Sequence, residues 1–228
     1  MNPSRLKYRS EKLERLDIGD FTPQEYQLWE KEMRLIHSFL GERRAMRKSL
    51  VSEIRKNRAD YIKILDVGAG SGELSARLLK EFEERRISVV GADASERAVL
   101  SMREKGIQGV RCDALKLPFA DGSFDYVYST LFLHHLSDRN AIALIREMKR
   151  IARQKFFIID LERQFIPYLL FKTLGGLIFQ PFTRDDGSLS ILRSFNRKEL
   201  ENIAVKAGVK NICIRRSYLN RLILSGTN

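Results

Sequence analysis

The segment Gly68-Ala69-Gly70-Ser71-Gly72 has the composition of a loop that lets a ligand approach the backbone. Glycine allows sharp turns and close contact, and a helix that starts directly after such a loop presents unpaired N–H groups. A merely tight turn between a strand and a helix is the alternative. An apolar run over 62–67 precedes the loop and a helical pattern follows it, as the binding mechanism requires, so we interpret the segment as a binding loop.

Two acidic residues end later apolar runs. Asp93 lies 21 residues after Gly72, where a carboxylate can accept hydrogen bonds from both hydroxyls of a ribose. A helix-capping role is the alternative, because a helix begins nearby. Asp113 ends the following run, where its carboxylate can reach an adenine amino group, and Ala114 and Leu115 can form an apolar wall beside it.

His134 and His135 are two of only three histidines in the chain. Adjacent histidines suggest a metal pair, a catalytic base or ordinary structure. Metal binding is disfavoured, because neighbouring side chains project differently and no Asp, Glu or His cluster has ligand spacing, so we expect no metal. Histidine suits a general base, since its ordinary pKa lies near the working pH. The structural alternative is packing beneath the helix that begins near Ser137-Asp138, and both interpretations remain open.

The elements that must position these residues alternate between strands and helices. Strands are predicted at 61–68, 87–93, 107–114, 123–130 and 155–161. Helices are predicted between them at 73–86, 95–106 and 138–152. This alternation indicates βαβ units, in which a parallel sheet carries helices on both faces.

Both ends of the chain extend this pattern. Residues 1–59 are predicted to be a helical extension, in which Thr22 caps a helix that ends at Gly41 and a second helix covers 42–58. At the other end, a helix at 197–208 is followed by two strands with a short connection, which favours an antiparallel hairpin.

Composition narrows the class of protein. The net charge is +12, and the two cysteines, Cys112 and Cys213, lie far apart, which argues against a zinc site or a disulfide scaffold and suits a reducing cytoplasm. The sequence has neither a signal-peptide core nor an apolar run of membrane-spanning length. Basic charge can attract RNA or anionic lipid, but no Lys/Arg run is interleaved with aromatic residues, so dispersed surface charge is the favoured interpretation.

Over residues 60–160 the chain resembles the class I S-adenosylmethionine-dependent methyltransferases, and most of all their small-molecule branch, similar to the ubiquinone/menaquinone-type enzymes. The motifs of that family are matched in order and at family spacing by LDVGAGSG, GAD, CDA and PFADGSFD. The resemblance implies a set of residues that bind S-adenosylmethionine: Asp66, Gly68, Ala69, Gly70, Gly72, Asp93, Ala94, Asp113, Ala114 and Ser129.

The fold implied is a Rossmann-like α/β/α sandwich with a mostly parallel seven-stranded sheet and an antiparallel C-terminal edge hairpin. The methyltransferase domain would cover 60–228, with a lid-like insertion at 163–192 and the extension at 1–59 as a substrate cap. The apolar part of this insertion is either a core helix or a wall that binds an aromatic or lipid-like substrate. In the second case the insertion could also contact a membrane surface.

The reaction implied is O- or C-methylation of a small aromatic or lipophilic molecule in the cytoplasm, of the kind found in bacterial secondary metabolism. Methyl transfer from a sulfonium is an in-line displacement that needs positioning and at most one base. His135 matches the family pattern His-Leu-x-Asp, and His134 is its less expected neighbour. Either would face the emerging methyl group.

Other functions remain as alternatives. A nicotinamide dehydrogenase shares the strand–loop–helix pattern, but its third glycine comes one residue later. The basic charge favours an RNA or protein methyltransferase as the main alternative, although the segment STLFLHH replaces the Asn/Asp-Pro-Pro-Tyr/Phe motif of amino-methylating enzymes that act on nucleic acids. A non-catalytic cofactor-binding subunit would also keep the loop. The sequence indicates neither the acceptor nor the oligomeric state.

Overall fold

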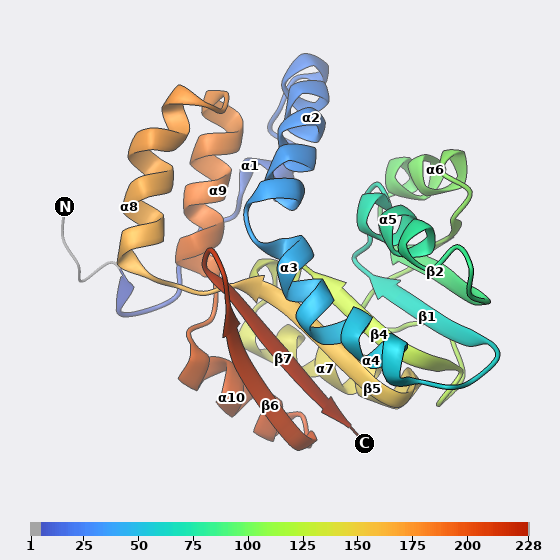
Figure 1. Ribbon diagram of the computed structural model, residues 1–228. Coiled ribbons are helices and arrows are strands. Elements are labelled where there is room, and N and C mark those ends of the chain that lie inside the picture. The colour runs from blue at the N-terminus through green and yellow to red at the C-terminus, as the bar shows by residue number, and fades with distance from the viewer. Residues whose placement is uncertain (1–5, 228) are drawn as a thin grey trace.

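The computed structural model describes residues 6–227, apart from the side chain of Ser38. One sheet of seven strands, in the order β3-β2-β1-β4-β5-β7-β6, runs through the molecule (Figure 1). The strands are β1 (Ile62–Val67), β2 (Ile87–Asp93), β3 (Gln108–Arg111), β4 (Phe124–Thr130), β5 (Ala152–Leu161), β6 (Lys210–Ser217) and β7 (Arg221–Thr227). β1 to β5 are parallel, and β7 lies antiparallel between β5 and β6. The predicted sheet and its edge hairpin are confirmed.

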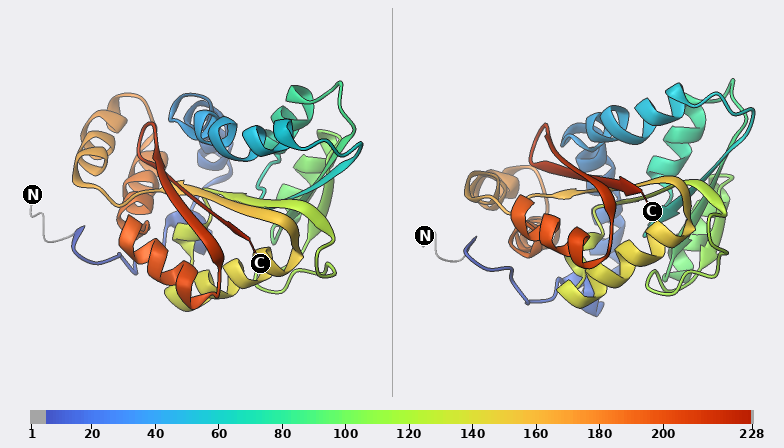
Figure 2. Two further views of the ribbon diagram at one scale, coloured as in Figure 1. Left: turned by 60° about the horizontal axis from the view of Figure 1, so that its bottom comes forward. Right: turned by 90° about the horizontal axis from the view of Figure 1, so that it is seen from below.

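Helices cover both faces of this sheet (Figure 2). One face packs against α7 (Asp138–Ile151) and α10 (Arg197–Lys206). The opposite face packs against α3 (Glu42–Met46), the π-helical turn η2 (Arg47–Val51), α4 (Ser52–Lys56) and α5 (Glu73–Glu81). α6 (Glu96–Glu104) packs beside β2, β3 and α5.

Local sequence explains these elements. In α7, Ser137 caps the first turn, and the buried residues recur at spacings of three and four: Ala141, Leu144, Ile145, Met148 and Ile151. Such a stripe buries one side of the helix against the sheet. Thr22 forms a capping box at the start of α2 (Pro23–Phe39), as predicted, and Asn196 forms another at the start of α10.

A group of helices stands over the end of the sheet where β4 and β5 finish (Figure 1). It contains α1 (Arg15–Ile18), α2, α8 (Phe165–Leu174), the 3-10 turn η4 (Gly175–Leu177) and α9 (Pro181–Arg193). α8 and α9 form a pair, and α9 also contacts α1 and α2. The predicted insertion at 163–192 therefore lies beside the N-terminal helices.

The structure differs from several of the sequence-based boundaries. β3 covers only Gln108–Arg111, so Asp113 lies in the loop after the strand rather than in it. α5 ends at Glu81 rather than at 86, and β5 begins at Ala152, directly after α7, because Ala152 already pairs with Phe124. The helix expected at 42–58 contains the π-helical turn η2. Residues of α3, η2 and α4 share one core cluster with β1 and β4, so this part of the predicted extension packs on the sheet. No helix in the described part of the chain is long and apolar enough to cross a membrane.

Candidate active site at the carboxyl ends of the strands

The glycine loop after β1 needs glycine for steric reasons. Gly68, Gly70 and Gly72 have φ angles of +70°, +53° and +72°, in the left-handed region that side chains disfavour. A Cβ atom at Gly68 would also lie 2.7 Å from Cγ of the Phe132 ring, whereas one at Gly70 would meet open space. The loop therefore exposes backbone at Gly70 and packs against an aromatic ring at Gly68.

Asp93 fixes this loop from the end of β2. Its Oδ2 accepts a hydrogen bond of 2.9 Å from Gly70 N, and its Oδ1 accepts one of 2.9 Å from Ser95 N, at the N-terminal cap of α6. The structure thus brings together two residues that the sequence predicts to bind one ligand. The helix cap itself is Ser95, whose side chain accepts from Ala98 N, so Asp93 is not the capping residue of α6. Its neighbour Ala94 is exposed.

Asp66 lies beneath the loop. Its Oδ2 accepts hydrogen bonds of 2.7 Å from both Ser75 Oγ and Tyr128 OH, and its Oδ1 has no partner among the described residues. Burial raises the pKa of Asp66 to about 7, although these two hydrogen bonds oppose the shift. Asp66 therefore connects β1 to α5 and β4 on either side of the loop.

A cavity of about 490 Å³ extends from the glycine loop to the helices above it. Gly68, Ala69 and Ser71 line one end. Most of the remaining wall is apolar and comes from two helical segments, α2 and the region from α8 to η4. The apolar residues of this wall are Trp29, Met33, Ile36, Leu40, Pro167, Leu170, Phe171, Leu174, Ile178 and Phe179.

His134 lies in the polar part of the cavity wall and is nearly fully buried. Its Nδ1 is 2.7 Å from Asp160 Oδ1, and its backbone N–H donates to Asp160 Oδ2 at 2.9 Å. Burial opposes ionisation of Asp160, but the attraction of His134 and these hydrogen bonds outweigh it, so the pKa of Asp160 lies below its ordinary value. The carboxylate fixes the ring so that Nε2 is free to act.

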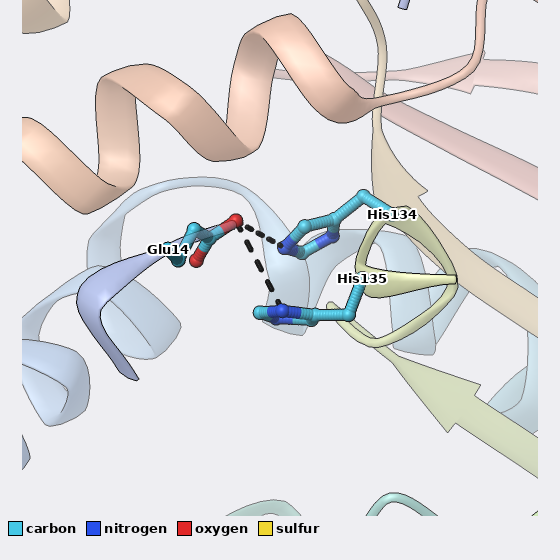
Figure 3. Close-up of side chains that lie close together, drawn as sticks. All are labelled: Glu14, His134 and His135. Carbon is cyan, nitrogen blue, oxygen red and sulfur yellow. Dashed lines mark ion pairs between the residues drawn. The ribbon is translucent and has the colours of Figure 1, made fainter. Parts of the chain in front are cut away.

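Glu14 meets both histidines from the opposite wall (Figure 3). Its Oε1 lies 3.8 Å from His134 Nε2 and 4.0 Å from His135 Nδ1, and this oxygen has no hydrogen-bond partner in the described chain. Burial raises the pKa of Glu14 to about 7. His135 is less buried, and its Nδ1 is 2.7 Å from Asp17 Oδ1. Carboxylates and imidazoles thus alternate along the cavity wall.

The central part of the chain is similar in sequence to known proteins. The family model described as "Methyltransferase domain" matches residues 64–155. Residues 64–155 are therefore similar to a methyltransferase domain. The resemblance to class I S-adenosylmethionine-dependent methyltransferases, with their Rossmann-like fold, is confirmed.

Two curated relatives and one solved structure illustrate the match. The demethylmenaquinone methyltransferase of Beutenbergia cavernae is 34% identical over 122 residues, which cover 53% of this chain and 48% of that protein. The ubiquinone/menaquinone biosynthesis C-methyltransferase of Geotalea uraniireducens is 29% identical over 194 residues, which cover 75% and 80%. A SAM-dependent methyltransferase from Aquifex aeolicus has a TM-score of 0.61 at 18% identity, covering 87% and 97%. The chain thus spans about half the length of the first relative.

Three other residues predicted to bind the cofactor, Asp113, Ala114 and Ser129, do not line the cavity. Asp113 is exposed, its Oδ1 accepts from Leu115 N at 2.8 Å, and Ala114 is half-buried. Ser129, expected to line the pocket, is fully buried and does not line the cavity. The next residues, Thr130 and Leu131, line it instead, because Leu131 leaves the strand with a φ of +47°.

The acidic partners of the two histidines were not predicted from the sequence. Asp160 ends β5, so the rule that ligands bind where parallel strands end could have indicated it. Glu14 had no such signal, because 120 residues separate it from His134. The expectation that the two histidines project apart is wrong, since their ring centroids lie only 4.2 Å apart.

Glu14, His134 and His135 could together hold a metal ion, because one donor atom from each lies within 4.8 Å of the others. Protein groups already supply charge to this cluster. Arg193 Nε lies 3.8 Å from Glu14 Oε1, and Asp17 occupies Nδ1 of His135. The absence of a metal stays a prediction.

Proposed function

We propose that this chain transfers a methyl group from S-adenosylmethionine to a small aromatic or lipophilic molecule. The observation that carries the proposal is one cavity that joins the glycine loop, at Gly68 and Ala69, to an apolar chamber between α2 and α8. A polar cofactor loop at one end and a mainly apolar wall at the other suit a reaction between a sulfonium cofactor and an apolar acceptor.

The residues around the loop fit the cofactor. Open space at Gly70 admits a ligand against the backbone, and the Asp93 carboxylate lies beside it, where a ribose could bind. We propose that the methionine part lies along Gly68, Ala69, Gly70 and Gly72, and the nucleoside along Asp93, Ala94, Asp113 and Ala114. Asp66 and Ser129 are buried and would support the cofactor site from below rather than touch the cofactor. The cofactor supplies an electrophilic methyl group on sulfur.

We propose that His134 removes the proton of the acceptor. Asp160 holds Nδ1 of the imidazole, which leaves Nε2 as the basic atom on the cavity side. The acceptor oxygen or carbon loses its proton to this nitrogen and forms a bond to the methyl carbon, while the carbon–sulfur bond breaks and S-adenosylhomocysteine is released. His135 is the second candidate, but its Nδ1 is already bonded to Asp17. The surrounding wall positions the acceptor and excludes water.

The proposal is tested first by binding. Titration calorimetry should detect S-adenosylhomocysteine and give no heat with NAD, and radiolabelled methyl groups should then reach members of a panel of alkylphenols and naphthoquinols. A protein that binds NAD, or that binds neither ligand, would contradict the assignment. Labelled lysate RNA or protein in place of the small molecules would support the alternative function instead.

We further propose that the helical group over the cavity contacts a membrane surface, where a lipophilic acceptor would be found. Side chains at the outer end of α8 and in η4 are apolar and solvent-exposed, among them Leu174, Leu177 and Ile178. The cytoplasm remains the predicted location. Arg221 is the single Lys or Arg among the cavity-lining residues of the described chain, so the basic surplus lies outside the proposed acceptor site.

A further inference from the structure

Arg221, the first residue of β7, is a buried cation without an anionic partner. Only 3% of its surface is exposed, and it lines the cavity. Its Nη1 donates to Leu219 O at 3.2 Å, its Nε has no hydrogen-bond partner, and no ion pair involves it within residues 6–227. Burying a charge that is not paired is costly, so the site is incomplete as it stands.

Neighbouring charges offset this cost only in part. Burial lowers the pKa of Arg221, and the more distant carboxylates of Glu42 and Asp160 oppose that shift. The acidic residues that line the cavity face other groups. Glu73 pairs with Arg77, Asp186 accepts the backbone N–H groups at the start of α1, and Glu14 lies beside His134, His135 and Arg193. The guanidinium therefore keeps hydrogen-bonding capacity for a ligand in the cavity.

Asn220 adds a second unsatisfied group at the same place. Both side-chain atoms, Nδ2 and Oδ1, are buried and have no partner among the described residues, and the residue lines the cavity beside Arg221. It lies in the β6–β7 turn with a φ of +62°. An amide and a guanidinium that lack partners at one wall can together bind the oxygens of a carboxylate or of a related oxyanion.

We propose that Arg221 and Asn220 bind an acidic oxygen group of the methyl acceptor, which makes the acceptor an amphipathic anion: a carboxylate, enolate or phenolate on an apolar body. This inference rests on the proposed function, since it concerns the acceptor end of the same cavity. The apolar body would lie against α2 and α8, whose side chains form most of the wall.

Position across the sheet favours the acceptor over the methionine carboxylate of the cofactor. The glycine loop follows β1, whereas Arg221 begins β7, and β4 and β5 lie between those strands. Three strand spacings of about 4.8 Å separate the two by about 14 Å. The strand next to β7 is β5, which carries Asp160 and so holds His134. Arg221 is thus nearer to the proposed base than to the loop.

The test uses decanoate and decanol, two probes that differ in their polar end. Trp29 is the single tryptophan of the chain and lines the cavity, so its fluorescence reports binding. We expect the wild-type protein, with or without saturating S-adenosylhomocysteine, to bind decanoate at least tenfold more tightly than decanol. Arg221→Met should remove this preference, Arg221→Lys should retain part of it, and Asn220→Gly should reduce it while tolerating the left-handed backbone.

Arg215→Met is the matched control, because Arg215 is exposed on the neighbouring strand β6, and it should leave the preference unchanged. Thermal unfolding at or above the wild-type temperature for Arg221→Met would show that the variant folds.

Equal binding of decanoate and decanol by the wild type would overturn the inference. So would an Arg221→Met variant that loses affinity for S-adenosylhomocysteine but keeps the decanoate preference, since the anion would then be the carboxylate of the cofactor. Failure of the wild type to bind S-adenosylhomocysteine contradicts the proposed function, while the decanoate comparison still decides the role of Arg221.

Discussion

His134 and His135 are adjacent in sequence, yet their ring nitrogens form hydrogen bonds to different carboxylates. Asp160, on the neighbouring strand, holds His134, whereas Asp17, in the N-terminal segment, holds His135. His135 is the residue that matches the family pattern, but His134 is the more buried and has an oriented imidazole. A base needs a fixed ring and a free nitrogen, and His134 meets both conditions.

We predict that His134→Gln lowers kcat by about a hundredfold or more, because glutamine keeps a polar contact to Asp160 but cannot take a proton. His135→Gln should lower kcat by less than about tenfold. Both variants should bind S-adenosylhomocysteine as the wild type does, which calorimetry can check. Equal losses in the two variants would assign the base to the pair rather than to His134.

Glu14 should make stability depend on pH. Its pKa is raised from 4.5 to about 7 by burial, so the folded protein binds more protons than the unfolded chain between these values. Stability contributed by this group is therefore lost as the pH rises through that window. Glu14→Gln, which resembles the protonated form, should gain roughly 3 kcal/mol relative to wild type between pH 4 and pH 8. Urea unfolding at both pH values measures this, and a constant difference between the two proteins would contradict it.

At the scale of elements, the glycine loop and the helix that follows it form one rigid unit. The backbone N–H groups of Gly68 and Ala69 both donate to Ala92 O on β2, at 2.9 Å and 3.2 Å, while Asp93 holds Gly70. The loop is therefore shaped before any ligand arrives. A substitution that disturbs it should affect cofactor binding more than overall folding.

We predict that Gly68→Ala weakens binding of S-adenosylhomocysteine by about tenfold or more, because its new methyl group would meet the Phe132 ring and its φ is left-handed. Gly106→Ala is the control. Its φ of +73° carries the same backbone strain, but a Cβ atom there has open space and the residue lies after α6. Similar losses of affinity in both variants would point to general destabilisation instead.

Structural elements could be predicted from the sequence where the residues that determine them lie close together along the chain. The glycine loop, the Asp93 position, the strand–helix alternation and the caps at Thr22 and Asn196 all depend on residues within one or two turns of each other. The cavity was not predictable in this way. Its polar wall joins Glu14, His134 and Arg221, which only tertiary packing brings together. Periodicity also could not show that Ser129 would be buried while Leu131 turns toward the cavity.

At the scale of the whole molecule, exposed apolar side chains lie at the tip of the helical group, beside the cavity. Leu177 and Ile178, at the tip of the helical group, are 84% and 68% exposed. Exposed apolar side chains at one end of a molecule favour contact with a lipid surface, especially beside an apolar chamber. The net charge of +12 would add attraction to anionic lipid.

We predict that the protein co-sediments with vesicles of phosphatidylglycerol and phosphatidylcholine, and that replacing Leu177 and Ile178 with serine weakens this binding by about tenfold, since less apolar area is buried. Val205→Ser is the control, because Val205 is 61% exposed on α10, on the other face of the sheet. Sedimentation without loss in the double variant would exclude the helical tip as the contact.

The N-terminal segment has a consequence for how the protein is made. Arg9 donates to the backbone oxygens of Arg193 and Leu136, and Asp186 accepts from the start of α1, so residues 9–16 are held by parts of the chain far downstream. Because residues 9–16 are synthesised before α9, they can dock only after α9 has been made. Until then Glu14 is not in place, and a nascent chain would hold an open, unfinished chamber.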